Sequence, residues 1–277
     1  AFFKKNKSPF YSINTGKVSG YNDVGQVMFQ TLLSSKKKSE ILKKFKINIV
    51  KNFGPGSAYW KNLKIRKKYK KVKWKKPING PWIHQNILET IKNIKVGKSI
   101  TGGTKVNESD GYCAALPYFL FNNKEKELKN IIRSVANSKI NETYAISKLK
   151  IIELANKGEK NPVQSFLKRY RKNKYFKDVI SNIKKVLRQK DQNHTLTVKK
   201  FGKACIYPGT FMGSIHAIIT SNNYKSAITK TIKAGGCNCS RANFVGAYFA
   251  ALKPGSIPVS WIRRTLPAKN ILKYIYS

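Results

Sequence analysis

The stretch KEKELKNIIRSVAN, residues 124–137, decides the fold class because its apolar side chains recur at the spacing of an α-helix. The apolar side chains at positions i, i+3, i+4, i+7 and i+8 are Leu128, Ile131, Ile132, Val135 and Ala136. Side chains at this spacing lie on one face of a helix. The stretch therefore predicts an amphipathic helix that buries this face.

Other parts of the chain carry helical signals as well. One stretch repeats the same geometry with Phe176, Val179, Ile180, Ile183 and Leu187. Asn141 resembles an N-cap and Gly158 a C-cap of a helix that lies between the two stretches. Further helices are expected at residues 211–220, 224–233 and 242–252, and around Trp261. The first hundred residues are turn-rich, and we predict one all-α domain over residues 1–277.

Charge is the second prominent property. The 277 residues include 56 Lys and Arg but 12 Asp and Glu, which gives a formal net charge of +44. Self-repulsion at this charge is costly unless a polyanion offsets it. The excess of Lys over Arg suits an AT-rich genome, but such a bias does not explain the scarcity of acidic residues. We therefore interpret the charge as partly functional and expect a polyanionic partner.

Composition also limits the class of protein. A hydrophobic fraction of 41% supports a folded chain rather than a disordered basic tail. The sequence contains no run of about 18 apolar residues, so it predicts no membrane span. The irregular spacing of Cys113, Cys205, Cys237 and Cys239 favours a reducing compartment over a secreted disulfide framework. The sequence begins at Ala1, so a targeting peptide that has been removed would not be visible in it.

The densest basic segment covers residues 61–76 and interleaves Tyr69 and Trp74 with its cations. Its ten cations are Lys61, Lys64, Arg66, Lys67, Lys68, Lys70, Lys71, Lys73, Lys75 and Lys76. Cations among aromatic rings suit RNA, because phosphates meet Lys and unstacked bases meet rings. The alternative is a solvated loop whose rings pack into the core. We predict RNA contacts at these cations, at Trp74, and at a second cluster, Lys168, Arg169, Arg171 and Lys172.

One loop and the helix after it resemble a known family. The segment AGGCNCSRAN at residues 234–243, followed by GAYFAA at residues 246–251, resembles the Gly-Gly-Asp-Thr-Asp-Thr region of the ADP-ribosylglycohydrolases. The branch with cysteine or selenocysteine in this loop, the J-type crystallins and selenoprotein J, is more similar still. Agreement extends over nearly the whole chain, at SPFYSI (8–13), Tyr21-Asn22-Asp23, FGPG (53–56), Gly80-Pro81-Trp82, Asp110-Gly111-Tyr112 and Ile257-Pro258 with Trp261.

The resemblance implies an all-α domain with two magnesium ions on Asp, Glu and Thr side chains, beside a site for ADP-ribose. In this sequence Cys237 and Cys239 stand where the family has Asp, and Ser240 follows them. Asp23 remains of an Asp pair, and the family's first Gly-Asp motif has no counterpart. Magnesium requires several oxygen ligands, usually carboxylates. We therefore expect no cofactor and no catalysis from the degenerate positions Asp23, Asp110, Cys237, Cys239 and Ser240.

Other interpretations of single residues stay open. Cys237 and Cys239 follow a Gly-Gly turn and open a helix, so they could be redox-active, or could bind a soft metal with His216. The alternative is that both are inherited loop residues without a role. His84 and His194 show no triad-like context in the sequence. Glu108 and Asp110 could run acid/base chemistry if the fold held them a few ångströms apart.

These observations favour a structural, RNA-binding subunit of a ribosome, in mitochondria, built on a hydrolase-like fold that has lost its activity. The expected partners are ribosomal RNA and neighbouring ribosomal proteins, with no membrane and no small-molecule substrate. The alternative is an active ADP-ribosyl hydrolase, or a thiol-dependent enzyme, with an atypical site. A third possibility is a protein packed at high density, as crystallins are, but strong self-repulsion disfavours it.

Overall fold

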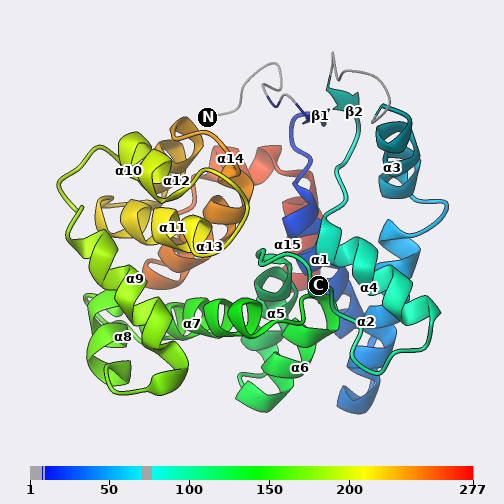
Figure 1. The fold of residues 1–277 in the computed structure, drawn as a ribbon, viewed down its shortest axis with the longest axis horizontal. Helices are drawn as coiled ribbons and strands as arrows, with labels where there is room; N and C mark the ends of the chain where they lie inside the picture. Colours follow the sequence, from blue (N-terminus) through cyan, green and yellow to red (C-terminus); the bar gives the residue numbers. More distant parts are fainter. Residues whose placement is uncertain (1–7, 9, 70–76, 277) are drawn as a thin grey trace.

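The computed structural model describes residue 8, residues 10–69 and residues 77–276, and it confirms the all-α fold class (Figure 1). The α-helices are α1 Gly20–Ser34, α2 Lys38–Phe53, α3 Ala58–Tyr69, α4 Gln85–Lys95, α5 Asp110–Phe121, α6 Glu125–Val135, α7 Lys139–Asn156, α8 Pro162–Tyr170, α9 Lys177–Leu187, α10 His194–Phe201, α11 Gly209–Ile219, α12 Tyr224–Lys233, α13 Asn238–Leu252, α14 Val259–Arg264 and α15 Leu266–Tyr276. A 3-10 turn, η1 (Lys174–Phe176), precedes α9. Two short strands, β1 (Tyr11–Ser12) and β2 (Ile78–Asn79), pair in parallel. None of the described helices has the length and apolar character needed to cross a membrane.

The helices expected from residue 124 onward are present. α6 covers the opening stretch, and α12 has the expected bounds. α13 starts four residues earlier than expected, at Asn238. The N-cap of α7 is Ser138, whose hydroxyl accepts a hydrogen bond from the amide of Asn141, so the prediction of Asn141 as the cap was wrong. Gly158 follows the end of α7 with φ +78°, a conformation that favours glycine.

The description of the first hundred residues as turn-rich was wrong, because α1 to α4 occupy most of them. α2 shows why the pattern was missed. Its buried residues, Ile41, Phe45, Ile49 and Phe53, lie four apart, so the buried stripe is one residue wide. The positions beside this stripe are mostly polar, with lysines and asparagines among them, and no wide apolar face stands out from the sequence.

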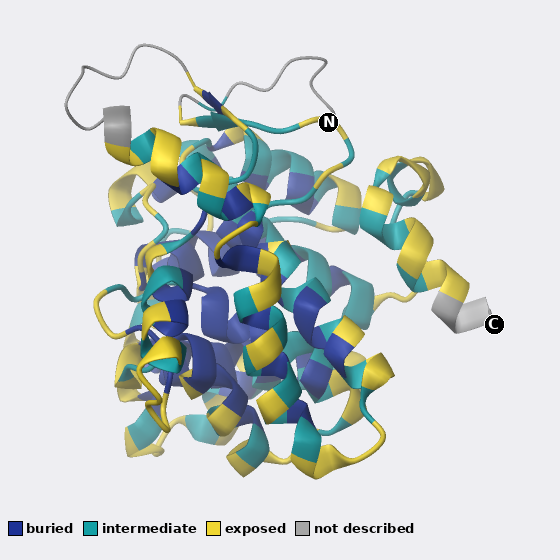
Figure 2. Ribbon diagram, turned by 90° about the vertical axis from the view of Figure 1, so that its right-hand side faces the viewer, coloured by how far each residue is buried: buried dark blue, intermediate teal, exposed yellow. Residues whose placement is uncertain are grey.

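The core is built around a few central helices. α5 packs against α1, α6 and α7, and α13 packs against α7, α11 and α12. α7 and α11 are buried on nearly every face, as expected for helices surrounded by others. The buried residues gather in the interior of the molecule (Figure 2). α8, α9 and α10 follow one another along one side of the molecule, at the left of Figure 1, and α2, α3 and α4 form the opposite side.

Candidate functional site

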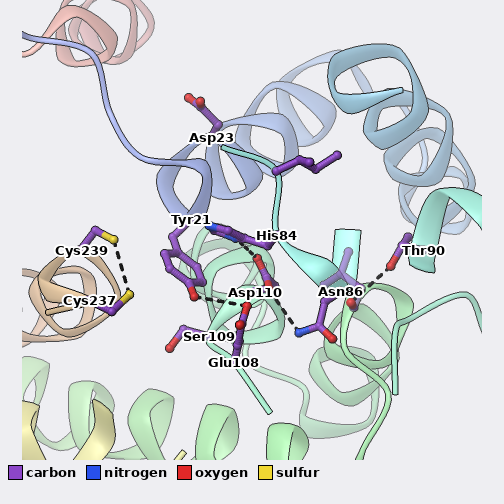
Figure 3. A network of polar contacts seen from close by, with 12 residues as sticks. Tyr21, Asp23, His84, Asn86, Thr90, Glu108, Ser109, Asp110, Cys237 and Cys239 are labelled. Carbon is purple, nitrogen blue, oxygen red and sulfur yellow. Dashed lines mark hydrogen bonds and ion pairs between the residues drawn. The ribbon is translucent and has the colours of Figure 1, made fainter. Parts of the chain in front are cut away.

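The N-termini of α1, α5 and α13 meet at one place in the fold (Figure 3). The hydroxyl of Tyr21, at the start of α1, donates to Oε2 of Glu108, just before α5, over 3.4 Å. Asn22 of α1 accepts a hydrogen bond from Asn243 of α13. A helix N-terminus carries a partial positive charge and free amide groups, so it favours anionic side chains. The convergence therefore suits carboxylates and thiolates.

His84 and Asp110 form the centre of this site. Nδ1 of His84, the residue before α4, lies 2.7 Å from Oδ1 of the fully buried Asp110. Nδ2 of Asn86 donates to the other carboxylate oxygen over 3.2 Å. The ring of Tyr21 lies against the imidazole, with 3.9 Å between centroids. Burial alone would lower the pKa of His84, but the charge and hydrogen bond of Asp110 raise that pKa overall.

Glu108 completes a group of three. Its carboxylate, that of Asp110 and the imidazole of His84 each offer a ligand atom, and these atoms all lie within 4.8 Å of one another. Burial and the charge of Asp110 raise the pKa of Glu108 to about 7. Glu108 and Asp110 are thus held a few ångströms apart, the condition that the sequence could not test. The sequence suggested Glu108 and Asp110 as a possible pair but not their partnership with His84, which lies in a separate segment with no characteristic spacing.

Three thiols lie beside this group. The sulfur atoms of Cys237 and Cys239 are 3.8 Å apart at the N-terminus of α13. Hydrogen bonds from the thiols of Cys205 and Cys239 lower the pKa of Cys237 and raise that of each donor. Cys237 is therefore the most acidic thiol of the cluster. His216 does not join it, because its ring nitrogens face Nδ1 of His194 at 2.9 Å and a carbonyl oxygen at 3.0 Å.

Cys237 is expected to react with iodoacetamide at pH 6 at least about ten times faster than Cys113, because thiolates are the nucleophilic form. Cys113 is buried, and burial raises its pKa. Peptide mass spectrometry after timed quenching measures both rates in the same sample. Cys237→Ser should remove the fast label and leave Cys113 slow. Equal rates at the two positions would contradict the assignment of the thiolate.

The His194 and His216 pair predicts acid sensitivity. Burial and the charge of His216 lower the pKa of His194 to about 3, and burial lowers the pKa of His216. Below pH ~6.5 the unfolded chain binds a proton at position 194 that the folded chain does not, so His194 should lower the free energy of unfolding by about 1.4 kcal/mol per pH unit. His216 contributes in the same direction. Urea unfolding at pH 7 and pH 5 measures this. His194→Asn should reduce the dependence of the free energy of unfolding on pH. An unchanged dependence would argue against His194 as a source of the acid sensitivity.

A buried lysine of α7 adjoins the site and was not anticipated. Nζ of Lys148 donates to the hydroxyls of Ser109 and Tyr207 over 3.1 and 3.0 Å, and lies 4.6 Å from the ring centroid of Tyr112. The side chain is fully buried. Burial lowers the pKa of Lys148 to about 7. A single Lys among the apolar residues of a helix gives no signal in a sequence with this many lysines.

The predicted RNA-binding residues divide into described and undescribed sets. Lys61, Lys64 and Lys67 are exposed on α3, and Lys168, Arg169, Arg171 and Lys172 are exposed at and after α8. Arg66 is half-buried, with its guanidinium 4.3 Å from the ring centroid of Trp82. Lys68 lies in α3, and nothing is described of its side chain. Six predicted residues lie outside the described part of the chain: Lys70, Lys71, Lys73, Trp74, Lys75 and Lys76.

Known proteins resemble the whole chain. No family model matches it. Crystallin J1A of Tripedalia cystophora is 27% identical over 96% of this chain and 80% of its own length. Crystallin J1B of the same organism is 25% identical over the same shares. A solved structure, "ADP-ribosylglycohydrolase-related protein complex", superposes with a TM-score of 0.61 at 12% identity, over 91% of this chain and 77% of that one.

The chain is a homologue of the J1 crystallins with an ADP-ribosylglycohydrolase-like fold. The resemblance implied by the loop at residues 234–243 is therefore confirmed. Because the structural likeness has low sequence identity, it establishes the fold and not the activity.

The positions where ADP-ribosylglycohydrolases bind magnesium do not fit that ion in this J1 crystallin homologue. Asp23 accepts a hydrogen bond from the hydroxyl of Tyr59, and burial raises its pKa. The hydroxyl of Ser240 donates to the carbonyl of Cys237 over 3.0 Å. Cys237 and Cys239 supply sulfur, whereas magnesium selects oxygen. Asp110 pairs with His84.

Proposed function

We propose that this chain is a structural RNA-binding subunit of a mitochondrial ribosome and that it no longer hydrolyses ADP-ribosyl bonds. The observation that carries the proposal is the formal net charge of +44 on a folded domain. A compact protein with this charge is strongly self-repelling, and a polyanion is the partner that offsets it. Ribosomal RNA offers phosphate charge over a large, irregular surface.

The fold makes the outer surface more positive than the composition suggests. Of the twelve acidic residues, Asp110 and Glu142 are buried, and Asp23 and Glu108 are half-buried and hydrogen-bonded to tyrosines. Glu142 is also engaged by the exposed Arg133 and by the hydroxyl of Tyr175. These four carboxylates therefore neutralise little of the positive charge of the surface lysines. Phosphate groups of a partner can supply the missing negative charge.

Exposed cations gather on one side of the molecule, formed by α8, α9 and α10. We call this side the basic edge. Its exposed cations are Lys168, Arg169, Arg171, Lys172, Lys174, Lys177, Lys184, Lys185, Arg188, Lys190, Lys199, Lys200 and Lys203. Clusters that are separate in the sequence thus follow one another along one side of the fold (Figure 1). The length of this side suits a nucleic-acid backbone better than a small anion.

A second basic surface lies on α3, on the opposite side of the molecule (Figure 1). Lys61, Lys64 and Lys67 are exposed there, near the indole of Trp82, which Arg66 covers. Basic surfaces on two sides suit a protein embedded among several RNA segments. The sequence shows no helix-turn-helix, zinc-finger or RNP motif that would favour DNA or single-stranded RNA.

Loss of the ancestral chemistry supports the same proposal. The positions expected to hold magnesium present two thiols, a hydroxyl and two carboxylates, of which Asp23 is bound by Tyr59 and Asp110 is paired with His84. A domain with thiols where the family has metal-binding acids, and with a lysine-rich surface, fits a structural role better than a catalytic one.

One observation favours a second candidate, a thiol-dependent enzyme with an atypical site. The thiolate of Cys237 lies close enough to the carboxylate of Glu108 to help raise its pKa. A nucleophile beside acid/base groups is a minimal catalytic arrangement. Substituting Cys237 and Cys239 by Ser would abolish any such activity and leave RNA binding intact.

Salt titration tests the proposal. Affinity for a ribosomal RNA fragment should fall linearly on a log–log plot as salt rises, because phosphate contacts release counterions. The same protein should release no ADP-ribose from ADP-ribosylated protein in magnesium. An RNA affinity that does not change with salt concentration, or magnesium-dependent release of ADP-ribose, would refute the proposal.

A further inference from the structure

We propose that His84, Glu108 and Asp110 together bind one divalent transition-metal ion, such as Mn²⁺ or Zn²⁺. This site is separate from the positions Asn22, Asp23, Cys237 and Cys239, where the family resemblance would put magnesium. The inference stands on the geometry of three side chains. The RNA-binding proposal uses none of them, and the resemblance singled out Asp110 alone.

The ligand atoms come together from three points in the chain. His84 ends the loop before α4, Glu108 ends the loop before α5, and Asp110 is the first residue of α5. One nitrogen and two carboxylate oxygens lie within 4.8 Å of one another. One imidazole with two carboxylates suits manganese, iron or zinc, whereas magnesium and calcium prefer oxygen alone.

The surroundings orient each ligand. Gly20 packs against the far edge of the imidazole, since a Cβ atom there would come within 3.3 Å of Nε2 of His84. Nδ1 of His84 is thereby turned toward the carboxylates. Asn86 donates to Oδ2 of Asp110, and Tyr21 donates to Oε2 of Glu108. Hydrogen bonds of this kind from outside a metal site fix the ligands and leave their remaining lone pairs for the ion.

The burial and charge of the two carboxylates favour a bound cation. Asp110 is fully buried and Glu108 is half-buried, so their two charges face one imidazole within a small volume. Buried charges in proteins are paired or coordinate metals. The nearby Lys148 is engaged by the hydroxyls of Ser109 and Tyr207 and does not pair with either carboxylate. A divalent cation would compensate both.

Titration of the full chain with Mn²⁺, followed by the electron paramagnetic resonance signal of the free ion, tests the site. The signal should report one bound ion per chain, and Zn²⁺ should displace it. The net charge of +44 helps the measurement, because it repels cations from the rest of the surface. Glu108→Gln and His84→Gln should each weaken Mn²⁺ binding by at least about 100-fold, since loss of an outer hydrogen bond alone costs about 10- to 100-fold.

Asp23→Asn is the matched control, because it neutralises a half-buried carboxylate of the same region and should leave Mn²⁺ binding unchanged. Circular dichroism of each variant separates loss of the site from loss of the fold. Glu108→Gln keeps the shape of the side chain and its acceptor for Tyr21. Absence of stoichiometric Mn²⁺ and Zn²⁺ binding overturns the proposal. So does binding that survives Glu108→Gln and His84→Gln in folded protein, or that depends on Asp23.

Discussion

Joint substitution of Lys168, Arg169, Arg171 and Lys172 by glutamine is expected to weaken binding to ribosomal RNA by roughly two to three orders of magnitude in ~0.1 M salt. All four side chains are exposed on the basic edge. Each lost phosphate contact removes about 0.7 to 0.9 from the slope of log affinity against log salt, so the slope should become shallower by about three. Filter binding or fluorescence anisotropy over a salt series measures both quantities.

The control has the same net charge. Lys36, Lys37, Lys38 and Lys43 are exposed before and on α2, on the other side of the molecule from α8. Their joint substitution by glutamine also removes four charges and should weaken binding by less than about tenfold, through the long-range field alone. Equal losses of RNA affinity in the two variants would mean that binding depends on net charge alone. The basic edge would then not be a specific RNA-binding surface.

Lys148→Met is expected to change how stability depends on pH. Lys148 has a pKa of about 7 in the folded chain, because it is buried, and about 10.4 when unfolded. Between these values the unfolded chain holds a proton that the folded chain lacks, so rising pH stabilises the fold by about 1.4 kcal/mol per unit. From pH 7 to pH 9 this contribution amounts to about 2 to 3 kcal/mol, and Lys148→Met should lack it.

Urea unfolding of both proteins at several pH values measures the difference. The comparison is needed because burial also raises the pKa of Cys113, so its thiol destabilises the fold above pH ~8.5 in both proteins. The hydroxyls of Ser109 and Tyr207 lie 3.1 Å apart, so each is expected to keep the other as a partner in Lys148→Met. Parallel curves for the two proteins would show that Lys148 is charged in the fold at neutral pH.

The sequence predicted the fold well where helices bury a broad face. α6 and α12 were found because apolar residues recur on one side for three turns or because clear boundaries flank them. α1 to α4 were missed. In α2 the buried stripe is one residue wide, which leaves polar residues, lysine most often, at most of the other positions. The spacing of apolar residues could not predict the type of fold. The family resemblance predicted an ADP-ribosylglycohydrolase-like fold, which the structure has.

The site was predicted only in part. Asp23, Asp110 and the thiols were singled out through the resemblance, and the structure places Asp110 and the thiols at one convergence of helix N-termini (Figure 3). The partnership of His84 with Glu108 and Asp110 joins residues 24 or more positions apart, which no local pattern encodes. The buried Lys148 was hidden by the abundance of exposed lysine.

Sedimentation of mitochondrial extract through sucrose tests the central claim most directly. An antibody to this chain should detect it with ribosomal particles at moderate salt and in the soluble fraction at high salt, because its RNA contacts are electrostatic. The variant lacking Lys168, Arg169, Arg171 and Lys172 should leave the particles at lower salt than the control variant does. A protein found free of ribosomal particles at every salt concentration would contradict the claim.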